Sequence, residues 1–85
     1  MMIMSYQEKK DEVWEKGQQV RGKDPHVYKK DKLGNDIYKP SYGKNSPLGW
    51  EIDHSIPLSK GGTDHLNNLQ PLNTTANRQK GNKKI

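Results

Sequence analysis

The sequence predicts a small α+β fold, and three patterns in its second half predict it. Residues 50–54 (WEIDH) alternate apolar and polar side chains, as a half-buried β-strand does. Residues 69–73 (LQPLN) indicate a second short strand. Helix signals follow it, with Asn73 or Thr74 as the N-cap and Gly81 as the C-terminal stop. The expected local order is therefore strand, loop, strand, helix.

Two further elements are expected before this unit. The segment SYQE is typical of a capping box and begins a predicted helix over residues 5–20, which either covers the core or forms a loosely attached arm. Residues 26–40 predict a β-hairpin, in which Gly34 and Asn35 supply the positive φ angles of a tight turn. The lysines of this hairpin favour a solvated edge over a DNA-contacting ribbon.

Composition and charge limit the class of protein. The 85 residues make one small domain, 1–85, with too few apolar side chains for a thick core. The absence of cysteine excludes disulfides and a cysteine-based zinc site. A net charge of +5 favours a polyanionic partner such as nucleic acid, and residues 82–85 form a basic tail. The opening MMIM is too short for a signal peptide or a membrane span, so we expect a cytoplasmic protein with no membrane partner.

Three short segments stand in an order that points to one chemistry. Asp53 and His54 close the first strand, NNLQPL lies at 67–72, and NRQKG lies at 77–81. With the Gly-Gly loop between them, these segments resemble the HNH endonuclease family over residues 50–81. The resemblance implies a ββα-metal (His-Me finger) core, preceded here by the predicted helix and hairpin.

The resemblance also implies a role for each motif residue. His54 corresponds to the general base and Asp53 to a metal ligand. Asn68 is the middle asparagine, and Asn77 takes the last position as the second metal ligand, which makes an H-N-N variant. The cysteine pairs that hold a structural zinc in many members are missing. The implied activity is metal-dependent DNA cleavage that leaves 5′-phosphate and 3′-hydroxyl ends.

The residue types suit this reaction. Histidine accepts a proton near neutral pH, and an asparagine amide donates and accepts at once, so Asn68 can hold the bend after His54. Carboxylate and amide oxygens are hard donors, which favours Mg²⁺ or Mn²⁺ over Zn²⁺. The basic residues expected to contact the DNA backbone are Arg78, Lys80, Lys83, Lys84 and Lys60. Phosphate contacts of this kind predict salt-sensitive binding with little sequence preference.

Several alternatives stay open at this level. The chain could be a basic nucleic-acid-binding module with an inactive nuclease motif, or a DNase toxin domain. A chain this short suits a phage or mobile-element nuclease in a bacterial or phage-infected cell. Nicking, double-strand cleavage, a monomer and a homodimer are all compatible with the sequence. His26 and His65 are expected to be exposed loop residues.

Overall fold

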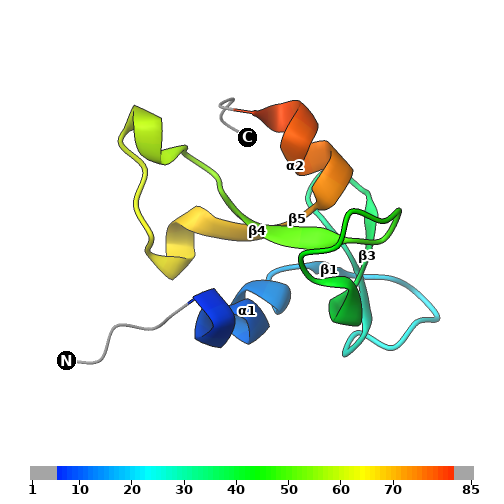
Figure 1. Cartoon of the computed structure of the whole chain (residues 1–85). Coiled ribbons are helices and arrows are strands. Elements are labelled where there is room, and N and C mark those ends of the chain that lie inside the picture. The colour runs from blue at the N-terminus through cyan, green and yellow to red at the C-terminus, as the bar shows by residue number, and fades with distance from the viewer. Residues whose placement is uncertain (1–5, 82–85) are drawn as a thin grey trace.

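The computed structural model describes residues 6–81 and contains two antiparallel sheets and two α-helices (Figure 1). The elements are α1 (Tyr6–Trp14), β1 (Gln18–Gln19), β2 (Tyr28–Lys30), β3 (Asp36–Tyr38), β4 (Trp50–His54), β5 (Leu69–Asn73) and α2 (Thr74–Lys80), with short 3₁₀ turns at Lys39–Ser41, Leu58–Lys60 and Leu66–Asn68. Strands β1, β2 and β3 form one sheet, and β4 pairs with β5. This is the predicted α+β class. Across residues 6–81, no helix has the length and apolarity to cross a membrane.

The β4–β5–α2 unit has the predicted order and the predicted boundaries. The two strands pair over their whole length, from Trp50 opposite Asn73 to His54 opposite Leu69. The side chain of Asn73 then caps α2 by accepting hydrogen bonds from two backbone N–H groups of its first turn, and the helix ends at Gly81. Helices α1 and α2 lie on opposite sides of the β4–β5 ribbon (Figure 1). This unit is the ββα core.

Two tryptophans form the centre of the core. The rings of Trp14 and Trp50 lie with their centroids 5.0 Å apart, and both side chains are fully buried. Each indole N–H donates to a backbone carbonyl, so neither ring buries an unsatisfied donor. Val13, Ile37 and Leu69 complete this cluster. Helix α1 is therefore part of the core, and the alternative of a loosely attached arm is wrong.

The predicted helix over residues 5–20 is too long. Residue 5 lies outside the described residues, and α1 ends at Trp14 instead of continuing to residue 20. Residues Gln18–Gln19 pair with β2 as strand β1. At Gly17, an added Cβ would lie only 2.9 Å from Cδ of Lys29, so this glycine lets the chain pass close to β2. Sheet pairing therefore overrides the helical pattern after Trp14.

The predicted hairpin is present, but its turn differs from the prediction. Gly34 has a positive φ of 86°, whereas Asn35 does not have a positive φ. The turn is wider than a two-residue turn because the backbone N–H of Asp31 donates to the carbonyl of Asn35. The lysines are also not all solvated: the side chain of Lys29 is buried and its Nζ donates to the backbone oxygen of Glu15.

The carboxylate of Asp31 organises this turn and joins it to the ββα core. It accepts hydrogen bonds from the backbone N–H groups of Leu33 and Asn35 at 3.0 and 2.8 Å. Its second oxygen accepts from the backbone N–H of Asn73 at 3.0 Å. Asp31 is fully buried. One side chain thus holds the hairpin turn against the residue that caps α2.

Candidate active site

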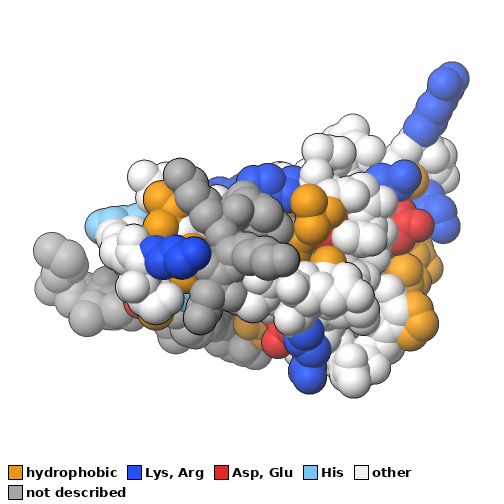
Figure 2. Space-filling model, turned by 90° about the horizontal axis from the view of Figure 1, so that it is seen from above, with side chains coloured by type: hydrophobic (Ala, Val, Ile, Leu, Met, Phe, Trp, Pro, Cys, Tyr) orange, Lys and Arg blue, Asp and Glu red, His pale blue; other side chains and the backbone are white. Residues whose placement is uncertain are grey.

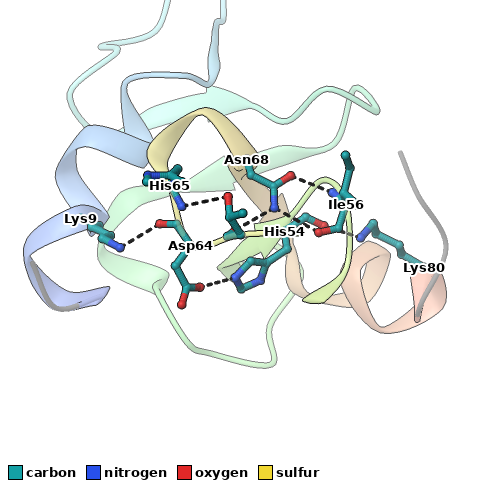
Figure 3. A network of polar contacts seen from close by, with 8 residues as sticks. Lys9, His54, Ile56, Asp64, His65, Asn68 and Lys80 are labelled. Atoms are coloured by element: carbon teal, nitrogen blue, oxygen red, sulfur yellow. Dashed lines mark hydrogen bonds and ion pairs between the residues drawn. The ribbon is translucent and has the colours of Figure 1, made fainter. Parts of the chain in front are cut away.

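Asp53 and His54 point in different directions at the end of β4. One carboxylate oxygen of Asp53 lies 3.2 Å from Nζ of Lys80 on α2, and the other accepts from Nε2 of Gln70 at 2.7 Å. His54 turns toward the following loop, where its Nε2 lies 2.6 Å from Oδ1 of Asp64 (Figure 3). Asp53, His54 and Lys80 nevertheless line one hollow of about 260 Å³. The hollow therefore brings the acid and the histidine to a common surface although the strand separates their side chains.

Asn68 makes the bridge across the loop that its amide group predicts. Its Oδ1 accepts from the backbone N–H of Ile56 at 2.9 Å, and its Nδ2 donates to the backbone oxygens of Ile56 and Thr63 at 3.1 and 2.8 Å (Figure 3). Asn68 is buried, so these bonds are shielded from water. They tie the chain just after His54 to the chain just before Asp64.

Gly62 permits this bridge because the backbone around it is crowded. A Cβ at this position would collide with the carbonyl oxygen of Ile56 and would lie 3.0 Å from Nδ2 of Asn68. Its neighbour Gly61 has a φ of 88° but open space around the position of a Cβ. The two glycines are therefore needed for different reasons. Gly61 adopts a positive φ that L-residues rarely adopt, and Gly62 leaves room for the carbonyl group of Ile56.

Replacing Gly62 by alanine is expected to displace the loop and break the Asn68 bridge, with a loss of about 2–4 kcal/mol in the free energy of unfolding. Chemical denaturation measures this loss. Gly61→Ala is the matched control, because it introduces only the conformational strain of an L-residue at positive φ, about 1–2 kcal/mol. Equal losses in the two variants would show that crowding at Gly62 does not matter.

Lys80 lies where the sequence did not predict it. Its side chain is only 3% exposed, and its Nζ donates to the carboxylate of Asp53 and, at 2.8 Å, to the backbone oxygen of His54. The side chain of Asp53 is 8% exposed. A buried carboxylate needs a counter-charge or donors, and α2 supplies the ammonium group. Lys80 was predicted to contact the DNA backbone from the surface. In the structure its side chain is instead buried in an ion pair with Asp53.

Replacing Lys80 by methionine is expected to cost about 3–5 kcal/mol in the free energy of unfolding, because it leaves a buried carboxylate without its counter-charge. Urea denaturation measures the loss. Arg78→Met is the matched control, since Arg78 is exposed on the same helix. Addition of Mn²⁺ is expected to restore part of the stability of the Lys80 variant by supplying a cation to Asp53. A variant as stable as the control would contradict the structural role of the pair.

Asn77 lies on α2 beside the same strand. Its Nδ2 is 3.5 Å from Oε1 of Glu51, which is two residues before Asp53 and so lies on the same side of β4. The same Glu51 carboxylate also affects Tyr42. Burial of the Tyr42 side chain raises the pKa of its hydroxyl, and the negative charge of Glu51 raises it further. The two predicted metal ligands thus lie on adjacent elements, but Asp53 contacts Gln70 and Lys80, whereas Asn77 contacts Glu51.

The donor set fits a hard divalent cation that is only partly held by protein. In the described part of the chain, no three His, Cys, Asp or Glu side chains are grouped so as to hold a metal ion. One carboxylate and one amide leave most of the coordination shell to water and substrate, as is common for Mg²⁺. The ammonium of Lys80 beside Asp53 shows that the fold accommodates a positive charge at this carboxylate.

Sequence reasoning missed two residues that contact the proposed site. Gln70 is directly opposite Asp53 in the β4–β5 register, so cross-strand pairing of the two predicted strands would have identified it. Asp64 lies in the loop after the two glycines. The only signal in the sequence that could have identified it is the presence of an acidic residue between the motif segments at 53–54 and 67–72. His26 and His65 are exposed, as predicted.

The remaining basic candidates lie around the site to different extents. Lys60 is exposed at the end of the 3₁₀ turn whose other two residues, Leu58 and Ser59, line the hollow, and Arg78 is exposed on α2. Lys83 and Lys84 lie outside the described residues. Viewed from the side of α2, the molecule carries Lys and Arg side chains spread along its length, with fewer acidic side chains between them (Figure 2).

A comparison with protein families finds a match in the second half of the chain. Residues 43–83 match a family model described as HNH endonuclease. The matched segment contains β4, the loop with Asn68, β5 and α2. No curated protein and no solved structure matches the chain.

Proposed function

We propose that the chain is a divalent-metal-dependent endonuclease that hydrolyses DNA phosphodiester bonds, because residues 43–83 match the family model described as HNH endonuclease. The expected products carry 5′-phosphate and 3′-hydroxyl ends. The observation that best supports this proposal is the hollow at the end of β4, which both Asp53 and His54 line. A histidine and a metal-binding carboxylate must reach one phosphate in this reaction, and the hollow is where they can do so.

The proposed roles follow from the chemistry of each side chain. His54 accepts a proton from the attacking water, and Asn68 holds the loop that fixes the position of His54. Asp53 and Asn77 hold Mg²⁺ or Mn²⁺. When bound, the cation supplies positive charge to the phosphate and to the leaving oxygen.

We propose that DNA is bound mainly through its phosphates. Lys60 is exposed next to Leu58 and Ser59, which line the hollow, and Arg78 is exposed on α2. Lys83 and Lys84 extend the basic sequence beyond the described residues. Contacts of this kind release counterions, so affinity should fall steeply with salt and depend little on sequence.

A second candidate is a DNA-binding module without catalysis. It is favoured by one observation: both carboxylate oxygens of Asp53 already have partners, in Lys80 and Gln70. A metal ion at Asp53 would have to share this carboxylate with the ammonium of Lys80 or displace it. This candidate differs from the first in predicting DNA binding without cleavage under every metal condition.

Nicking of supercoiled plasmid separates the two candidates. Purified protein is incubated with Mg²⁺, Mn²⁺, Ca²⁺ or Zn²⁺ in turn, and with a chelator as the blank. The nuclease proposal expects relaxed circles with Mg²⁺ or Mn²⁺ that DNA ligase seals directly, which requires 5′-phosphate and 3′-hydroxyl ends. DNA binding in a gel-shift assay with no relaxed circles under any ion would support the inactive module.

A further inference from the structure

The loop residue Asp64 makes a close contact with the ring of His54. Its Oδ1 lies 2.6 Å from Nε2 of the imidazole (Figure 3). The His54 side chain is 19% exposed, whereas that of Asp64 is 55% exposed. An ionised carboxylate only accepts hydrogen bonds. The hydrogen of a neutral His54 ring therefore belongs on Nε2 in this pair.

The backbone that carries Asp64 is held from two sides. Nζ of Lys9, on α1, donates to the backbone oxygen of Asp64 at 2.9 Å. Nδ2 of Asn68 donates to the backbone oxygen of Thr63 at 2.8 Å. These bonds come from elements on either side of the loop (Figure 3). The carboxylate is thus presented to His54 from an anchored backbone although the residue lies in an exposed loop.

We propose that Asp64 is a positioning residue that fixes His54 as the Nε2–H tautomer, so that Nδ1 is the nitrogen that accepts the proton. This inference rests on the proposed function of His54 as general base. The proton of water moves to Nδ1, the water oxygen bonds to phosphorus, and the bond to the 3′ oxygen breaks, with that oxygen taking a proton from solvent. The imidazolium formed carries hydrogen on both nitrogens, and the carboxylate of Asp64 stabilises its charge.

Asparagine is the informative substitution at this position. Asp64→Asn keeps the size of the side chain, but its amide N–H₂ can donate to Nε2 and so favours the tautomer with hydrogen on Nδ1. The nitrogen that should accept the proton is then already protonated. Asp64→Ala removes the acceptor and leaves the ring without this constraint.

The first readout is the kinetics of plasmid nicking. Asp64→Asn is expected to lower kcat by about 10- to 100-fold, less than the loss of a general base itself, with an unchanged KM for DNA. Asp64→Ala is expected to lower kcat as well. Asp36→Asn is the matched control: it makes the same change of charge at an exposed aspartate of strand β3 and should leave kcat unchanged. Wild-type kcat in both Asp64 variants would overturn the proposal.

The second readout is the tautomer of His54, measured by ¹⁵N NMR of the ring in the absence of DNA and metal. His26→Ala and His65→Ala assign the signals of the three histidines. Hydrogen on Nε2 in the wild type, and on Nδ1 in Asp64→Asn, supports the proposal, whereas hydrogen on Nδ1 in the wild type overturns it. This measurement does not depend on cleavage. If the wild-type protein nicks no plasmid, the proposed function is overturned, while the NMR result still tests the pairing of Asp64 with His54.

Discussion

Replacing His54 by alanine is expected to lower the rate of plasmid nicking by about 10²- to 10⁴-fold, the usual contribution of a positioned general base. The ring is mostly enclosed between β4 and the loop, and it lines the hollow with Asp53. DNA binding should persist, because the phosphate contacts proposed for Lys60 and Arg78 do not involve the ring. Initial rates of nicking and a gel-shift titration, both at the same salt concentration, measure the two effects separately.

His65→Ala is the matched control for this substitution. His65 is also a histidine of the loop region, but its side chain is exposed and is assigned no part in the reaction. Its nicking rate should equal that of the wild type. Cutting by the His54 variant at the wild-type rate would exclude His54 as the base and remove the main support for the mechanism.

Replacing Asp31 by alanine is expected to have the largest effect on stability. The substitution removes the acceptor of three backbone N–H groups, those of Leu33, Asn35 and Asn73. A buried donor left without an acceptor costs about 1–3 kcal/mol, so a loss of several kcal/mol is expected. Small domains have only about 5–15 kcal/mol in total. Far-ultraviolet circular dichroism with urea should show a variant that is largely unfolded at room temperature.

Two further variants make this result specific. Asp36→Ala removes an exposed carboxylate from the same hairpin and should leave the urea midpoint nearly unchanged. Asp31→Asn keeps one acceptor oxygen and should lie between the wild type and Asp31→Ala. If Asp31→Ala and Asp36→Ala were equally stable, the buried carboxylate would not be what joins the hairpin to α2.

The sequence predicted the ββα core well because each of its elements carries its own local signal. In the sequence of β4, apolar and polar residue types alternate from Trp50 to Asp53, and α2 has a capping residue at Asn73 and a stop at Gly81. These signals depend on neighbours a few residues away, so no knowledge of the rest of the fold is needed. The bridge made by Asn68 could also be predicted, since few side chains other than an amide can donate and accept hydrogen bonds across a loop.

Features that depend on contacts between distant residues were not predicted. Helix α1 ends at Trp14 because Gln18–Gln19 pairs with β2, and no local pattern in residues 5–20 records that pairing. Burial of Lys80 depends on how α2 packs on β4, since the charge of a lysine alone suggests a solvated or phosphate-binding position. The pairing of Asp64 with His54 likewise depends on the path of the nine residues that connect them.

The buried pair of Asp53 and Lys80 has a consequence for how the protein matures. In small metalloproteins the ligand cluster often stays unfolded until the ion arrives, so that metal supply controls folding. Here the ammonium of α2 neutralises the carboxylate of β4 from inside the same chain. We therefore expect the polypeptide to complete its fold without a metal ion, so that binding of the proposed ion would be a later event, separate from folding.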